Sequence, residues 1–240
     1  MDRMDIDTLS ARTAADMNTL FQDWEEVHKR KGYERFIRDG IVSLKDWYEQ
    51  TTPKVCYLLK EAYSDSEGFD LVQALRDGDP WRMWKKVAVW TEAIFQSFGQ
   101  CSAYDKERMQ KNSWKNTDCI AVINIKKSNG QSQSDDEELA AYAEADQDFL
   151  RRELDIINPD IILCGNTGDC LRTILGDSWK DNETAMTMFG QWNGKLVIDY
   201  YHPASQFPQS INYYALMAIC QVAKRRYDFC NGFVHPRECE

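Results

Sequence analysis

Three polar side chains with catalytic potential directly follow or end apolar segments of the chain. Glu61 follows the run KVCYLL, Asn124 lies near the end of DCIAVINI, and His202, one of only three histidines, follows KLVIDYY. A carboxylate can orient an attacking water, an imidazole N–H can stabilise a departing anion, and an amide can both donate and accept hydrogen bonds. These residues form a candidate catalytic site if the fold brings them together.

Four short runs rich in β-branched or large apolar residues must position these side chains. They lie at 54–59, 118–125, 160–165 and 195–201. The runs are continuous rather than alternating, which is typical of strands covered on both faces. In an open parallel sheet, ligands bind at the carboxyl ends of the strands, so we expect the polar residues that follow these runs to share one edge of the sheet.

Helical patterns separate the four runs. We expect helices over 80–99, 135–157, 167–176 and 211–229. Ser134 with Glu137 fits a capping box at the start of the second helix, which Pro159 stops. Strands that alternate with helices predict parallel crossover connections.

This pattern predicts a single α/β domain over residues 1–240. We expect a three-layer sandwich with a central, mostly parallel sheet of about four strands. Residues 1–50 form an N-terminal helical extension packed on the core, 54–230 form the core, and 66–116 form a helical insertion within it.

Composition limits the classes of protein and of site. The net charge of −10 argues against non-specific coating of nucleic acid, although it allows a local basic groove. The eight cysteines form no CxxC pair, so we expect reduced cysteines and neither metal nor cofactor. No apolar run approaches the roughly 18 residues of a membrane span, and the first residues lack the apolar centre of a signal peptide. We expect a cytoplasmic monomer without a membrane partner.

Several motifs together resemble the uracil-DNA glycosylase superfamily, most closely the branch whose first motif reads GEAPGxxE. The corresponding segments here are KEAYSDSE, VINIKKSNG and YYHPASQ, in the family's order. The segment FLRRELDIINPDIILCGNTGDCLRTILG is similar to the family's helix, strand and following helix. The resemblance spans roughly residues 54–230 and implies a uracil-DNA glycosylase-like fold.

The resemblance also implies roles for residues. Glu61 is the expected catalytic carboxylate, Asn124 the base-recognition amide, and His202 the group that stabilises the departing base. Further base contacts are expected from Ala62, Tyr63 and Phe69. Support of the pocket or contact with the DNA backbone is expected from Lys60, Ser64, Glu67, Lys126, Lys127, Ser128 and Ser205.

The chain departs from the family's pattern at informative positions. Lys60 replaces a motif glycine, and Tyr63 replaces a motif proline. The cysteines that hold an iron–sulfur cluster in the GEAPG branch are absent. A lysine and a tyrosine change the shape and charge of the pocket, so we expect a bulkier modified pyrimidine as the preferred base, as in bacterial glycosylases that remove modified cytosines from phage DNA.

The function that follows is a DNA glycosylase that hydrolyses the N-glycosidic bond of a flipped-out uracil-like or modified pyrimidine and leaves an abasic site. One alternative is a catalytically inactive module that binds modified DNA or nucleotides. A second is a nucleotide or nucleoside hydrolase. Each residue also has an ordinary structural explanation: Glu61 at a helix N-terminus, His202 bonded to a carbonyl, and Asn124 opening a turn.

Overall fold

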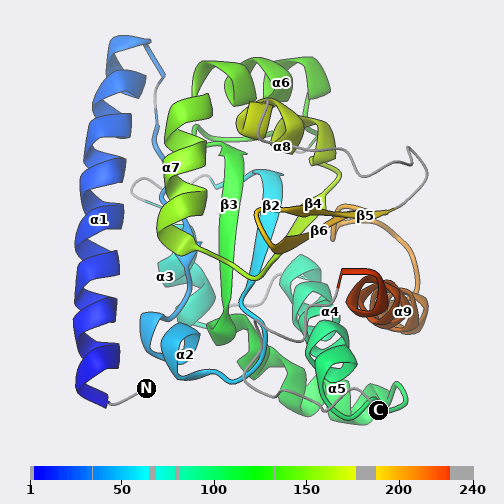
Figure 1. The fold of residues 1–240 in the computed structure, drawn as a ribbon. Helices are drawn as coiled ribbons and strands as arrows, with labels where there is room; N and C mark the ends of the chain where they lie inside the picture. The colour runs from blue at the N-terminus through cyan, green and yellow to red at the C-terminus, as the bar shows by residue number, and fades with distance from the viewer. Residues whose placement is uncertain are drawn as a thin grey trace.

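A mixed six-stranded sheet forms the centre of the computed structural model, which describes residues 3–33, 35–64, 69–78, 82–131, 133–176 and 188–227 (Figure 1). The strand order is β1-β3-β2-β4-β6-β5. The strands are β1 (Gly40–Ile41), β2 (Val55–Glu61), β3 (Ile120–Lys126), β4 (Ile161–Gly165), β5 (Phe189–Trp192) and β6 (Lys195–Tyr200).

The four strands expected from the sequence are the parallel centre of this sheet. β3, β2, β4 and β6 pair in parallel, whereas β1 and β5 add to the two edges in antiparallel orientation. The expectation of about four strands therefore undercounts the sheet by its two edges. β1 is too short to show a pattern. β5 had a signal in the sequence, because Asn-Gly is a dipeptide typical of two-residue hairpin turns. Asn193 and Gly194 form this turn between β5 and β6, and both have positive φ.

Helices cover both faces of the sheet. The helices are α1 (Arg3–Arg30), α2 (Leu44–Glu49), α3 (Leu71–Arg76), α4 (Arg82–Phe98), α5 (Lys106–Asn112), the 3₁₀ helix η1 (Ser113–Cys119), α6 (Asp136–Ala145), α7 (Gln147–Ile157), α8 (Gly168–Leu175) and α9 (Gln209–Tyr227). The first face packs against α1, α6, α7 and α8, and the second against α4 and α9 (Figure 1). The α/β layered architecture is confirmed. No helix in the described ranges combines the length and the apolar character needed to cross a bilayer.

α4 packs on the second face through residues at helical spacing. Trp84 and Trp90 are buried, and the Trp90 ring contacts the Tyr200 ring edge-on at 5.2 Å. The helix expected over 80–99 is observed from Arg82 to Phe98.

The helix expected over 135–157 is broken in two. Asp146 separates α6 from α7, and its buried carboxylate accepts hydrogen bonds from His28 Nε2 at 2.7 Å and Lys31 Nζ at 3.0 Å. The N-cap of α6 is Asp135 rather than Ser134, because the Asp135 side chain accepts from the first backbone N–H groups of the helix. His28 of α1 and Lys31, which follows α1, lie more than a hundred residues from Asp146 in sequence, so the local pattern could not reveal the break.

The N-terminal extension is part of the core. Trp24 of α1 is fully buried and stacks on Phe149 of α7 at 5.2 Å. The segment after α1 also contributes β1 to the sheet. The extension therefore belongs to the same packed unit as the strands that hold the candidate site.

Candidate functional site

The carboxyl ends of β3, β2, β4 and β6 meet at one edge of the sheet. Glu61 pairs in register with Lys126, and Gly165 with Tyr200. A Cβ added to Gly165 would lie 2.7 Å from Leu59 Cδ2 and 3.5 Å from His202 Cδ2. The His202 ring therefore lies against Gly165, close to Leu59 of β2. Since β4 separates β2 from β6, the backbones that present Glu61 and His202 are about 10 Å apart.

Glu61 is held by two partners in a nearly closed environment. Its side chain is 4% exposed, with Oε2 3.3 Å from Lys126 Nζ and Oε1 accepting from the backbone N–H of Gln131 at 3.3 Å. Gly130 lies so close that an added Cβ would be 2.6 Å from Glu61 Cγ. The carboxylate is fixed on one side by an ammonium and on the other by backbone.

Lys126 bridges two carboxylates. Its ammonium lies 2.9 Å from Glu138 Oε1 as well as beside Glu61. Burial lowers the pKa of Lys126, but the hydrogen bond to Glu138 and the charge of Glu61 outweigh it, so the pKa is raised overall. Lys126 is therefore an ammonium at neutral pH, and most of its bonding capacity is used within the protein.

His202 is positioned as a neutral hydrogen-bond donor. Burial, reinforced by the positive charges of Lys60 and Lys86, lowers its pKa to about 4. The backbone N–H of Ala204 donates to Nδ1 at 3.2 Å. A neutral imidazole that accepts at Nδ1 has its proton on Nε2, so Nε2–H is the group available to a ligand.

Asn124 is more constrained than the sequence suggested. The side chain is 3% exposed, and its Nδ2 donates to Asp39 Oδ2 at 3.1 Å, while its backbone N–H donates to the same oxygen at 2.7 Å. The amide was expected to offer both a donor and an acceptor to a base. One of the two Nδ2 hydrogens is therefore engaged, which leaves the other and the carbonyl oxygen for that role.

Lys127 does not face the DNA backbone as expected. Its side chain is 0% exposed, with Nζ 2.5 Å from Asp39 Oδ1 and 2.7 Å from Glu153 Oε2. Burial lowers the pKa of Lys127, whereas the two carboxylates raise it, and the net direction is upward. An ammonium enclosed by two carboxylates cannot reach a phosphate, so this expectation is wrong, and Lys127 belongs to a buried ionic triad with Asp39 and Glu153.

The remaining residues expected in the first motif are distributed around the edge. Lys60 Nζ forms an ion pair with Asp136 at 2.6 Å, Ala62 is buried, and Tyr63 is 54% exposed. The carbonyl of Ser64 accepts from Arg35 Nη1 at 2.9 Å. Glu67 lies outside the described residues.

Three further expected residues lie mainly within the protein. Phe69 is partly buried and packs against the core on the α4 side of the sheet. Ser128 Oγ is bonded to the Tyr142 hydroxyl at 2.8 Å. Ser205 Oγ is buried and has no hydrogen-bond partner among the described residues, and the Ser205 carbonyl accepts from Lys86 Nζ.

Sequence reasoning missed three residues that shape this site. Asp39 gave no signal, because it precedes a two-residue strand. Lys86 lies on α4 four residues before the buried residue Trp90, so its helical spacing was the signal that could have placed it on the inner face. Gly130 stood in the loop segment SNG, where a turn was the simplest explanation.

Within the described ranges, no group of three or more His, Cys, Asp or Glu side chains is placed to hold a metal ion. A cavity of about 340 Å³ adjoins the edge between α6 and α8, and its lining includes Asn166, Thr167 and Asp199. The arrangement offers a fixed carboxylate, a neutral imidazole donor and lysine charges, which suits acid–base and anion-stabilising chemistry.

No protein-family model matches the chain, and no curated protein is similar to it.

Proposed function

We propose that the protein is a DNA glycosylase that hydrolyses the N-glycosidic bond of a flipped-out uracil-like or modified pyrimidine and leaves an abasic site. The observation that supports it best is the placement of Glu61 and a neutral His202 at the carboxyl ends of β2 and β6, the two strands that flank β4 in the sheet. Gly165, at the end of β4, has no side chain and lets the His202 ring lie against the backbone between these two strands.

The proposed reaction assigns one task to each of these groups. The C1′–N bond breaks first, so the sugar becomes oxocarbenium-like and the base takes the electron pair. Glu61 stabilises the positive sugar, orients the water that attacks C1′ and accepts its proton. His202 donates a hydrogen bond from Nε2 to the departing base without giving up its proton.

Positive charge near His202 favours the same chemistry. Lys60 and Lys86 are close enough to lower the pKa of His202, so their potential also acts on a departing anion or on nearby phosphates. With one of its two Nδ2 hydrogens engaged by Asp39, Asn124 would accept from an N–H of the base through its carbonyl oxygen and could donate through its second Nδ2 hydrogen. A base whose edge presents a donor beside an acceptor is therefore the expected substrate.

A substrate panel tests the proposal. The protein is incubated with duplex and single-stranded DNA containing uracil or modified cytosines, and alkali then converts abasic sites to strand breaks. We expect breaks on at least one substrate, reduced by about 10²-fold or more in Glu61→Gln and in His202→Phe. The matched control Glu137→Gln changes an exposed carboxylate of α6 and should keep full activity. Absence of breaks on every substrate would overturn the proposal.

A nucleotide or nucleoside hydrolase is the second candidate, favoured by the net charge of −10. A free nucleoside or nucleotide would then be cleaved and would compete with duplex DNA, whereas a glycosylase would prefer the polymer. Equal binding of modified DNA by the parent and by Glu61→Gln, without turnover in either, would instead indicate a binding module.

A further inference from the structure

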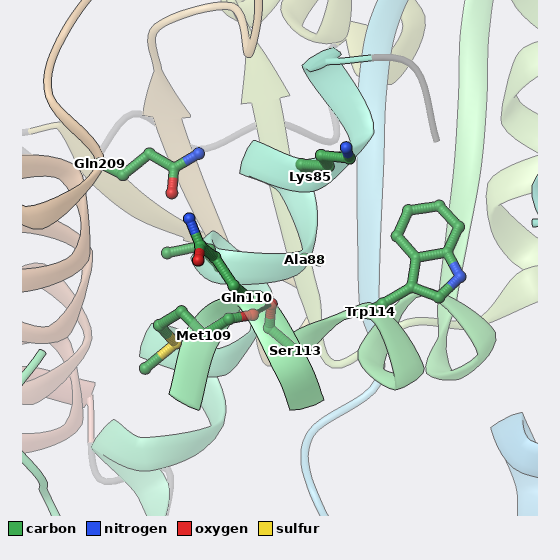
Figure 2. A pocket seen from close by; sticks show the side chains of 8 residues that line it. Lys85, Ala88, Met109, Gln110, Ser113, Trp114 and Gln209 are labelled. Carbon is green, nitrogen blue, oxygen red and sulfur yellow. Dashed lines mark hydrogen bonds between the residues drawn. The ribbon is translucent and has the colours of Figure 1, made fainter. Parts of the chain in front are cut away.

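A second cavity lies between α4, α5, η1 and the start of α9, and none of the expected catalytic residues lines it. Its volume is about 430 Å³, within the range of ligand pockets in proteins. Residues of α4, α5, η1 and the first turn of α9 line it (Figure 2). No step of the proposed glycosylase reaction uses this cavity.

The inner wall of the cavity is apolar. Ala88, Val89 and Met109 line it and are all buried. Trp114 is partly buried and lines the cavity at the end opposite Gln209 (Figure 2). A flat hydrophobic ligand could contact this wall and the indole.

Three polar side chains converge on the same cavity. The carboxamides of Gln110 and Gln209 point toward one another in Figure 2, and Lys85 extends from α4. Within the described ranges, no hydrogen bond or ion pair is formed by the side chains of these three residues. Each carboxamide offers a donor and an acceptor, and the ammonium offers a positive charge.

We propose that this cavity binds a nucleotide. Its base would pack against the apolar wall and Trp114, the edge of the base would bond to Gln110 and Gln209, and its phosphate would face Lys85. An apolar wall with a few convergent polar groups is typical of a small-molecule site, and aromatic side chains stack on any base. The combination of paired amides with one cation distinguishes a nucleotide from an uncharged aromatic ligand.

The position of the cavity allows two sources for this nucleotide. The segment 202–209 begins at His202 in the candidate catalytic site and ends at Gln209 in the cavity. Lys86, next to Lys85, donates to the Ser205 carbonyl in the middle of that segment. The occupant could be a free nucleotide or a nucleotide of a bound DNA strand. The proposal does not depend on glycosylase activity.

Calorimetric titration of the full chain with the four deoxynucleoside monophosphates and their nucleosides tests the site. We expect Lys85→Met to weaken nucleotide binding about fivefold or more and to leave nucleoside binding unchanged, because only the phosphate faces the ammonium. Gln209→Leu should weaken both ligands, and Trp114→Leu should weaken both by about tenfold. Lys111→Met, which removes an exposed α5 lysine outside the cavity, is the matched control.

Two outcomes would overturn the inference. One is the absence of heat with any nucleotide at millimolar concentration. The other is binding that survives both Lys85→Met and Gln209→Leu but is lost in His202→Phe, because the ligand then occupies the candidate catalytic site. Displacement of a bound nucleotide by a single-stranded oligonucleotide would identify DNA as the source, and failure of displacement would identify the free nucleotide. Lys85 and Gln209 lie at the surface, so their variants should fold.

Discussion

One backbone N–H decides what His202 can do. The histidine was a candidate from its place after a strand, but its tautomer depends on the Ala204 N–H that donates to Nδ1. Burial and two lysines then keep the ring neutral. At the scale of the residue, the structure therefore makes His202 a hydrogen-bond donor rather than a general base.

The low pKa of His202 predicts a pH dependence of stability. The folded pKa is about 4, below the ordinary value of 6.5. The unfolded chain therefore binds a proton between these values that the folded chain does not, and the free energy of unfolding falls as the pH drops from 6.5 toward 4. Urea titrations should show this loss, roughly 1 to 3 kcal/mol, in the parent but not in His202→Asn. Identical pH dependence in both proteins would contradict the assignment.

Gly130 controls the position of the Glu61 carboxylate. In Gly130→Ala the new methyl would lie 2.6 Å from Glu61 Cγ and 3.0 Å from the Ala62 carbonyl oxygen, so the carboxylate must move. We expect about a tenfold or greater loss of turnover on the best substrate of the panel, since displaced catalytic groups lose effectiveness steeply. Gly99→Ala is the control, because its nearest contact would be an ordinary 3.6 Å. Full activity in Gly130→Ala would show that Glu61 tolerates displacement.

At the scale of elements, the end of β3 connects the candidate site to distant parts of the chain. Asn124 and Lys127 both bond to Asp39 from the segment before β1, and Lys127 also reaches Glu153 of α7. Burial raises the pKa of Glu153, an effect that the charge of Asp39 reinforces and Lys127 opposes. The N-terminal extension and α7 thus fix the strand that presents Asn124 and Lys126.

Removal of Lys127 should destabilise the fold strongly. In Lys127→Met, Asp39 and Glu153 remain buried without a counter-charge, which typically costs about 3 to 5 kcal/mol. Chemical denaturation of the variant measures the loss. Lys29→Met removes a lysine that is 69% exposed and paired with Glu25, and it should cost less than about 1 kcal/mol. A loss in Lys127→Met as small as in this control would show that the triad contributes little.

At the scale of the whole molecule, the distribution of charge matters more than its total. The chain has a net charge of −10, yet Lys60, Lys86 and Lys126 gather at the carboxyl edge of the parallel strands. Lys60 and Lys126 are paired with carboxylates that hold them in place. Lys86 bonds to a backbone carbonyl and forms no ion pair among the described residues, so its charge is the one at this edge that is available to an anionic ligand.

The sequence by itself determined the centre of the fold. The four continuous apolar runs are the four parallel strands, because burial on both faces leaves a pattern in each strand alone. The helices between these strands predict parallel pairing, and parallel strands place Glu61, Asn124 and His202 at the same edge of the sheet. The strand β1 and the break at Asp146 could not be predicted, because each depends on contacts with distant segments, whereas β5 was missed although its Asn-Gly turn is a local signal.

Only the tertiary structure decided what each polar residue does. Lys126 and Lys127 are adjacent and of the same type, yet one contacts Glu61 at the candidate site and the other is enclosed between Asp39 and Glu153. The side-chain amide of Asn124 donates a hydrogen bond to Asp39, which lies 85 residues away in sequence. A buried polar group needs a hydrogen-bond partner, and the fold determines which segments can supply one. Residue type and spacing in the sequence do not reveal which segments these are.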